Sequence, residues 1–188
     1  MKKLLVVMFI LSVTLFVHQY GEAAVSGLQQ GKSELGGYAD ISGTSSTAKV
    51  GSYSSTSTSS STSLGFTYGY FLTDAIQLSG RLFAVGTESS GTTTSTTYTY
   101  LEGKYHFYEK GQELVPYLGL GLGGLSIKSG GVSGSGSSVA LMGGLKFFIS
   151  ENTSINPELN ISSNSYSMSG AEITAATTRL FVGFSLYF

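Results

Sequence analysis

The chain has 188 residues, a formal net charge of −1 and only 11% charged residues. This size suits one domain, and ten Lys and Arg residues supply no clustered basic face of the kind that nucleic acid requires, so a nucleic-acid partner is excluded. The absence of cysteine excludes a disulfide framework, a thiolate metal site and lipid attachment through an N-terminal cysteine.

The first residues have the pattern of a secretory signal peptide. Two lysines precede a largely apolar run of 14 residues, Leu4 to Val17, and small residues follow around Ala23. A membrane-spanning helix needs about 20 apolar residues, so this run is too short to be an anchor. We predict a signal peptide over residues 1–23 and Sec-type export of residues 24–188, with cleavage after Ala24 as the alternative.

The exported part predicts an all-β structure. Apolar residues alternate with polar or small ones in eight stretches, joined by segments rich in glycine, serine and threonine. Each stretch has the roughly 9 to 11 residues that a tilted strand needs to cross a bilayer. The predicted strands are 33–43, 62–71, 75–87, 93–108, 114–127, 137–148, 154–162 and 171–188.

The two faces of these strands differ in chemistry. One face is apolar and uncharged, whereas the other carries asparagine, glutamine, small residues and eight charges. The eight comprise four acids and four bases: Glu34, Asp40, Glu102, Glu158, Arg81, Lys104, Lys146 and Arg179. A soluble β-sandwich, which is the alternative, would coat its outer faces with more charge than this.

A membrane barrel inverts the soluble arrangement, because its outer face meets lipid and its lumen is polar. Closure also leaves no strand edge unpaired in hydrocarbon. We therefore predict a transmembrane, eight-stranded, antiparallel up-and-down β-barrel whose lumen holds the eight charges as a paired network.

Aromatic residues gather beside three predicted periplasmic turns, within 68–78, 104–119 and 145–155. Such gathering is typical of an aromatic girdle at a membrane interface. The predicted girdle consists of Tyr70, Phe71, Tyr105, Phe107, Phe147, Phe148 and Tyr187.

Polar segments join the other strand ends, at 42–63, 88–97 and 128–138. The first has 16 Ser or Thr among its 22 residues. We predict long extracellular loops here. Because threonine and tyrosine keep strand propensity, the alternative is that the wall continues past the membrane as a ribbon.

Four features resemble the small outer-membrane β-barrel domain family, the relatives of the OmpA and OmpX barrels: the turn at 71–74, the strand at 115–124, the stretch at 143–148 and the terminal Phe188. The resemblance implies an integral protein of the outer membrane of a Gram-negative bacterium, in contact with membrane lipid and lipopolysaccharide. It also implies periplasmic chaperones and the barrel-assembly machinery as partners during biogenesis. Alternate residues would form the assembly signal, namely Leu180, Val182, Phe184, Leu186 and Phe188.

Full OmpA-like proteins carry a peptidoglycan-binding domain after the barrel. None follows Phe188, so we expect no role in cell-wall tethering.

The sequence predicts a closed lumen, since an eight-stranded barrel has an interior just wide enough for its side chains. The predicted lining includes Arg81, Phe83, Met142, Lys146, Phe148, Arg179 and Phe181. We expect a monomeric, non-enzymatic protein without cofactor or metal, which acts in surface interaction, adhesion or envelope integrity through its outer loops, where a host or surface ligand could bind. A narrow porin-like channel for small solutes is the alternative.

A lipid-modifying enzyme is a weaker alternative. Acyl chemistry would need a histidine beside a nucleophile and a carboxylate, and His106 is the only histidine in the exported part. We predict that it is a hydrogen-bonded interior residue on the periplasmic side. Gly119, Gly121 and Gly124 match a dinucleotide-binding pattern, but no helix follows them. We predict instead that Gly119, Gly121 and Gly123 make room in the lumen.

Overall fold

The computed structural model describes residues 28–40, 43–50, 53–89, 92–109 and 112–188. The predicted signal peptide, 1–23, lies outside the described residues. Within the described ranges, no helix is both long enough and apolar enough to cross a membrane.

Nine strands are found in the part of the chain that the structure describes. They are β1 (Ser33–Asp40), β2 (Gly43–Val50), β3 (Tyr53–Phe71), β4 (Ile76–Ser89), β5 (Thr92–His106), β6 (Leu114–Ser129), β7 (Val132–Ser150), β8 (Thr153–Met168) and β9 (Ala171–Tyr187).

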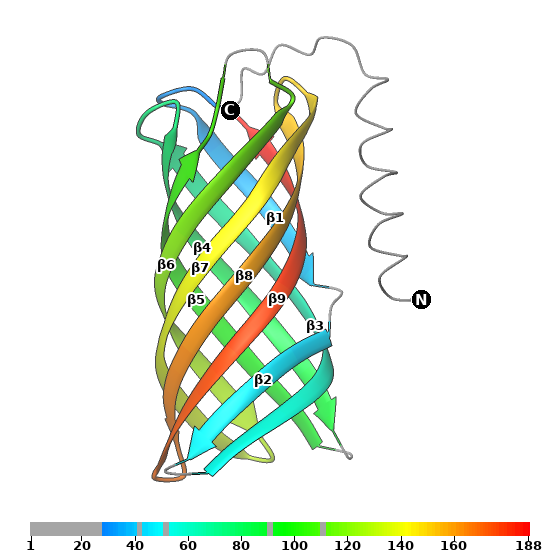
Figure 1. Cartoon of the computed structure of the whole chain (residues 1–188), viewed down its shortest axis with the longest axis vertical. Coiled ribbons are helices and arrows are strands. Elements are labelled where there is room, and N and C mark those ends of the chain that lie inside the picture. The colour runs from blue at the N-terminus through cyan, green and yellow to red at the C-terminus, as the bar shows by residue number, and fades with distance from the viewer. Residues whose placement is uncertain (1–27, 41–42, 51–52, 90–91, 110–111) are drawn as a thin grey trace.

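The nine strands form eight positions in a closed antiparallel wall (Figure 1). Strands β1 and β2 share one position, because both pair with β3 on one side and with β9 on the other. Their register with β3 is continuous, with Asp40 opposite Ser63 and Gly43 opposite Ser60. The predicted eight-stranded barrel is therefore confirmed.

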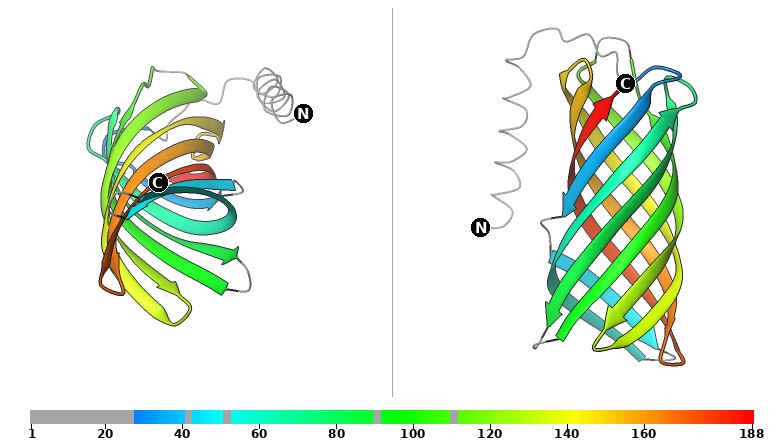
Figure 2. Two further views of the ribbon diagram at one scale, coloured as in Figure 1. Left: turned by 60° about the horizontal axis from the view of Figure 1, so that its bottom comes forward. Right: turned by 180° about the vertical axis from the view of Figure 1, so that it is seen from behind.

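The ring closes between β1 and β9, which lie side by side in both side views (Figure 1 and Figure 2). The Ser33 amide donates to the Phe188 carbonyl at 2.8 Å, and the Phe188 amide donates to the Ser33 carbonyl at 3.0 Å. We call the end of the cylinder that carries Phe188 the C-terminal end. The other end, with turns at 130–131 and 169–170, is the hairpin end.

The predicted long loops are wrong wherever the structure describes them. Strand β3 begins at Tyr53, β4 ends at Ser89, β5 begins at Thr92 and β7 begins at Val132, so much of 42–63, 88–97 and 128–138 is strand. Residues 41–42, 51–52 and 90–91 of those segments lie outside the described residues. Alternating serine and threonine fit a pleated strand, and composition alone had suggested loops. The wall continues as a ribbon, which was the alternative.

The turns at the hairpin end are correspondingly tight. Gly130 and Gly131 have φ angles of 55° and 84°, and Ser169 and Gly170 have φ angles of 52° and 80°. Two residues with positive φ give the backbone twist that a two-residue antiparallel hairpin prefers.

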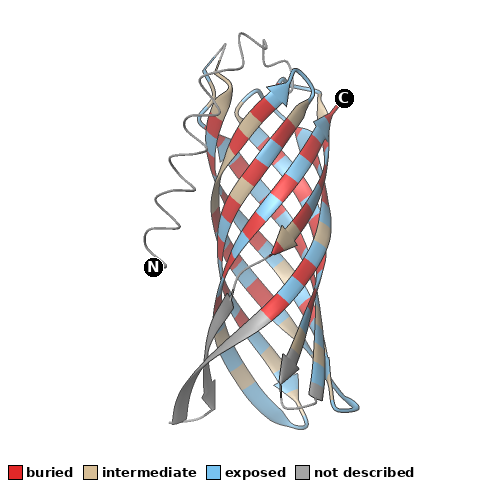
Figure 3. Cartoon of the chain, turned by 90° about the vertical axis from the view of Figure 1, so that its right-hand side faces the viewer, coloured by how far each residue is buried: buried red, intermediate tan, exposed pale blue. Residues whose placement is uncertain are grey.

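Side chains alternate between the lumen and the outside along each strand, as the banding in Figure 3 shows. The outer face carries a belt of large exposed apolar side chains, which we call the apolar belt: Leu35, Leu64, Phe66, Tyr68, Tyr70, Ile76, Leu78, Leu101, Tyr105, Leu118, Leu120, Leu122, Val139, Leu141, Ile149, Ile155, Leu159, Ile161, Leu180, Val182, Phe184 and Leu186.

Between the belt and the hairpin end, the outer face changes to exposed serine and threonine. We call these residues the hydroxyl band: Thr93, Ser95, Thr97, Thr99, Ser126, Ser133, Ser135, Ser137, Ser163, Ser165, Ser167, Thr174 and Thr178. Strands of 14 to 19 residues around most of the wall exceed the roughly 9 to 11 that cross a bilayer. The wall therefore projects beyond the belt.

The lumen contains two apolar clusters. The cluster near the C-terminal end, which we call the mouth cluster, consists of Leu28, Phe71, Val115, Phe148 and Tyr187. The cluster nearer the hairpin end, the aromatic layer, consists of Tyr38, Phe83, Val85, Tyr98, Tyr100, Leu125, Ala140, Met142 and Phe181. Polar and charged side chains lie between them.

Candidate functional site in the barrel interior

All eight predicted lumen charges are buried. They project from six strands: Glu34 and Asp40 from β1, Arg81 from β4, Glu102 and Lys104 from β5, Lys146 from β7, Glu158 from β8 and Arg179 from β9. Among the described residues, ion pairs join six of them: Glu34, Arg81, Glu102, Lys104, Lys146 and Glu158. We call these six the charged layer.

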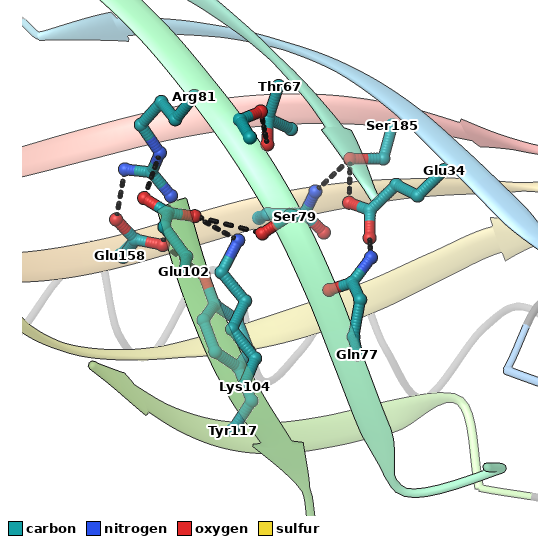
Figure 4. Close-up of polar contacts among 12 residues, drawn as sticks. Glu34, Thr67, Gln77, Ser79, Arg81, Glu102, Lys104, Tyr117, Glu158 and Ser185 are labelled. Carbon is teal, nitrogen blue, oxygen red and sulfur yellow. Dashed lines mark hydrogen bonds and ion pairs between the residues drawn. The ribbon is translucent and has the colours of Figure 1, made fainter. Parts of the chain in front are cut away.

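Arg81 is the centre of the larger group in this layer (Figure 4). Its Nη1 and Nη2 atoms donate to the two oxygens of Glu158 at 2.6 and 2.9 Å, and its Nε lies 2.8 Å from Glu102 Oε1. Lys104 Nζ lies 2.8 Å from the other oxygen of Glu102. The Tyr117 hydroxyl donates to Glu158 at 2.8 Å. One bidentate contact and three further contacts thus fix the guanidinium and both carboxylates.

Glu34 is the centre of the smaller group. Lys146 Nζ donates to both of its oxygens, at 2.8 and 2.7 Å. Gln77 Nε2 donates to Oε2 at 2.6 Å, and the Ser185 hydroxyl donates to Oε1 at 2.5 Å. Lys146 also donates to the Tyr187 hydroxyl at 2.8 Å. Strands distant in the sequence, β1, β4, β7 and β9, are thereby tied together across the lumen.

The charged layer is electrically balanced, with three carboxylates and three cations. Every carboxylate in the layer contacts at least two side-chain donors. Removing water strengthens each attraction but also imposes a desolvation penalty. The arrangement is therefore suited to bracing and closing the lumen.

Arg179 lies outside the charged layer. Its guanidinium carbon is 4.8 Å from the Tyr98 ring centroid and 5.5 Å from that of Phe83, and its Nη2 donates to the Tyr98 hydroxyl at 3.2 Å. The prediction that all eight lumen charges are paired is therefore wrong for Arg179, which forms no ion pair with the described residues. Its position on β9 is two residues closer to the hairpin end than Phe181, so its side chain enters the aromatic layer.

Part of the predicted aromatic girdle is wrong. Tyr70, Tyr105 and Phe107 are exposed on the outside, and Phe147 is half-buried, but Phe71, Phe148 and Tyr187 are buried in the lumen. The reason is the two-residue period of a strand, since neighbours such as Tyr70 and Phe71 must face opposite sides. The three inward rings instead form most of the mouth cluster.

The predicted assembly-signal residues all face outward on or next to β9: Leu180, Val182, Phe184, Leu186 and Phe188 are exposed. Their role in assembly stays a prediction.

His106 is buried but not hydrogen-bonded through its side chain, contrary to the prediction. Its ring centroid lies 5.3 Å from that of Phe71 and 5.5 Å from that of Tyr117. Neither ring nitrogen has a hydrogen-bond partner among the described residues, because aromatic faces surround it. Neither ring nitrogen is therefore hydrogen-bonded to a nucleophile or a carboxylate in the part of the chain that the structure describes.

Glycines make room in the lumen, as at Gly119. A Cβ atom there would lie 2.9 Å from Lys104 Cγ and 3.0 Å from Met142 Cγ. Sequence reasoning missed two contributors. Leu28 is completely buried in the mouth cluster, and its only signal is a lone large apolar residue before the first strand. Tyr117 bonds to Glu158, which its inward parity in 114–127 could have indicated.

The described residues contain no group of three or more His, Cys, Asp or Glu side chains that could hold a metal ion.

Comparison with known proteins gives the family. The model of the outer membrane protein beta-barrel domain matches residues 9–188, whereas no curated protein matches the chain. Neisserial surface protein A superposes with a TM-score of 0.65 at 12% identity, over 85% of this chain and all of that one. OprG of Pseudomonas aeruginosa gives 0.58 at 15%, over 87% and 99%. The N-terminal barrel domain of OprF from the same organism gives 0.51 at 21%, over 85% and 98%. At these identities the likeness shows the fold alone.

Proposed function

Since the chain belongs to the outer membrane protein beta-barrel domain family and is an integral β-barrel of the bacterial outer membrane, we propose that it is a non-enzymatic surface protein with a closed lumen. Its hydroxyl band serves surface interaction, adhesion or envelope integrity. The C-terminal end faces the periplasm and the hairpin end faces the exterior.

One observation carries this proposal, namely that the outer face has two zones while the lumen is filled. The apolar belt is followed by a hydroxyl band that projects past it. The mouth cluster, the charged layer and the aromatic layer occupy the lumen in succession. A filled interior disfavours the narrow channel, and the isolated ring of His106 gives no support to catalysis. What remains available for function is the projecting wall.

The β6–β7 hairpin allows a direct test. Leu125 lies opposite Gly136, so deleting 126–135 and inserting a two-residue turn shortens the hairpin without changing register. We expect the shortened protein to assemble in the outer membrane, while binding of intact cells to host or abiotic surfaces falls or envelope permeability rises. If cells carrying the shortened and the full-length proteins behave alike in both assays, the surface role is wrong.

The closed lumen is tested separately in a planar bilayer. We expect no steady conductance from the purified monomer. Discrete, stable conductance steps would favour the solute-channel alternative and contradict the filled lumen.

Biogenesis completes the proposal. Residues 1–23 are removed on export, and chaperones and the barrel-assembly machinery then receive the chain through its terminal strand. The intact mass of the mature protein distinguishes cleavage after Ala23 from cleavage after Ala24. Replacing Phe188 with Ser should lower the amount of assembled barrel without changing its synthesis.

A further inference from the structure

The border between the apolar belt and the hydroxyl band follows a regular course around the barrel. It is marked on each strand by the last large apolar residue of the outer face. From β3 to β9 these residues are Leu64, Leu82, Leu101, Leu122, Val139, Ile161 and Leu180.

The border does not follow the hydrogen-bonded rows. Leu64 lies opposite Ala84 rather than Leu82, and Leu82 lies opposite Thr99 rather than Leu101. Leu101, Leu122 and Val139 share one row. The border then shifts again, because Val139 lies opposite Ser163 and Ile161 lies opposite Thr178. Each of the four shifts moves the border by two residues in the same direction.

These shifts define a level plane. The four shifts total eight residues along the strands, at about 3.3 Å per residue. They accumulate over six steps between neighbouring strands, at about 4.8 Å per step. Together these distances give the border a slope of about 40° relative to the hydrogen-bonded rows. That slope matches the roughly 35–45° tilt of strands in outer-membrane barrels. The border is therefore perpendicular to the barrel axis, as the surface of the hydrocarbon layer must be. The hydroxyl band begins at the depth of the lipid headgroups.

The band presents hydroxyl groups in rows. Thr97 lies opposite Ser126, Ser126 opposite Ser135, and Ser135 opposite Ser167, and all four are exposed. Neighbouring strands are about 4.8 Å apart, and every hydroxyl both donates and accepts hydrogen bonds. The result is a surface on which hydroxyl donors and acceptors recur at short intervals, with few charges among them.

We infer that the hydroxyl band binds the neutral saccharide part of the outer-leaflet glycolipid, that is, the core sugars of lipopolysaccharide. The band continues the lipid-facing belt without a gap, so it lies at the height of those sugars. Sugar hydroxyls match serine and threonine, since both partners donate and accept. The inference rests on the orientation given under the proposed function.

Phosphate groups and protein partners fit the band less well. Exposed Lys128 lies among the residues of the hydroxyl band, opposite Ser95 and Ser133. It is the one cation there among the residues whose side chains are described, and exposed Glu172, opposite Ser167, brings the opposite charge. A protein interface would be expected to centre on aromatic or large apolar anchors, and the band has none. The core sugars are therefore the occupant that the chemistry favours.

The test is a competition experiment with purified, detergent-solubilised protein. Equal amounts of lipopolysaccharide with a complete core and of a deep-rough form, truncated to lipid A and the innermost sugars, are offered together. Bound glycolipid is then counted by native mass spectrometry. We expect the wild type to retain the complete-core form at least threefold over the truncated form. The triple variant Ser126→Ala, Ser135→Ala, Ser165→Ala should retain both equally.

Two controls separate the sources of binding. Ser150→Ala removes an exposed hydroxyl at the C-terminal end, and Lys128→Gln removes the cation that lies opposite Ser95 and Ser133 of the band. Both variants should keep the wild-type preference. Folding of every variant is checked by heat-modifiable migration in gels. Equal retention by the wild type, or an unchanged preference in the triple variant, would overturn the inference. Loss of preference in Lys128→Gln would assign the binding to phosphate instead. Because the assay uses purified protein, it can succeed even if the cell-surface assays of the shortened hairpin fail, and the reverse.

Discussion

Two neighbouring regions of the lumen hold buried cations in different ways. In the charged layer, Arg81, Lys104 and Lys146 each have a carboxylate oxygen within 2.8 Å. In the aromatic layer, Arg179 forms no ion pair within the described residues and lies instead against the rings of Tyr98 and Phe83. Both regions lie in the same narrow lumen. They differ in the groups that stabilise the buried cation, which are carboxylates in one region and aromatic rings in the other.

When a buried cation is paired with a carboxylate, each of the two charges depends on the other for its stability. Removing one member of a buried ion pair leaves its partner charged and uncompensated. A cation on aromatic faces has no such partner, and its contribution is limited to about 0.5–2 kcal/mol. Substitutions in the charged layer should therefore destabilise the barrel much more than substitutions of Arg179.

The largest effect is expected for Glu34→Ala. Lys146, Gln77 and Ser185 all donate to this carboxylate, and its removal would leave the Lys146 side chain without its carboxylate in a dry lumen. We expect the free energy of unfolding to fall by about 3–5 kcal/mol, measured by urea titration in lipid vesicles. The exposed Glu172 supplies the control, since Glu172→Gln should change little. If the double variant Glu34→Met, Lys146→Met is no more stable than Glu34→Ala, mutual dependence is not the cause.

The substitution Leu28→Ala tests whether the stability of the charged layer depends on the exclusion of water from the lumen. Leu28 is fully buried in the mouth cluster, whose Tyr187 accepts a hydrogen bond from Lys146 of the charged layer. Truncating a buried leucine costs about 2–5 kcal/mol. Water entering at the mouth should also make stability depend on salt, which screens exposed charges more than buried ones. Urea titrations at low and high salt measure both effects. Leu72→Ala, at an exposed turn residue, should show neither.

The contrast between the two regions could be predicted only in part from the sequence. The two-residue period placed all eight charges in the lumen, because a register error of one residue would have exposed them to lipid. It did not say which acid meets which base, since Arg81 and Glu158 are 77 residues apart and meet only through the tilt and register of the closed barrel. The position of Arg179 among rings depended on the same register.

Two predictions that used composition or sequence motifs, and not the two-residue alternation of a strand, were wrong. The serine- and threonine-rich segments suggested loops, although their alternation suits strands, and the paired aromatics beside turns suggested a girdle in which Phe71 and Phe148 faced outward. Leu28 precedes the first strand, so no period could place it. The segment after Leu28 is instead held to the end of β3, because the Gly31 amide donates to the Phe71 carbonyl at 2.9 Å and the Phe71 amide donates to the Lys32 carbonyl at 2.9 Å.

A smaller effect is expected at the border of the two regions. Gly119 lies between Lys104 of the charged layer and Met142 of the aromatic layer, and an added Cβ would also lie 3.0 Å from the Gly103 carbonyl oxygen. Overpacking of this kind costs about 1–3 kcal/mol, so Gly119→Ala should lower the urea midpoint. Gly103 faces open space and provides the matched control. Equal stability of the two alanine variants would mean that the lumen is less tightly filled than described.

Arg179→Met should have the smallest effect and is the most direct test of the comparison. The substitution removes the contacts with Tyr98 and Phe83, which accounts for about 0.5–2 kcal/mol, but it also removes a buried charge, and methionine packs well against rings. Arg81→Met is the matched variant, because Arg81 also lies over a ring, 4.5 Å from the Tyr38 centroid, yet its loss leaves Glu102 and Glu158 without their shared cation. The loss of unfolding free energy relative to the wild type should therefore be several-fold larger for Arg81→Met than for Arg179→Met. If Arg179→Met proves as destabilising as Arg81→Met, Arg179 also neutralises a carboxylate, and the two regions stabilise their cations in the same way.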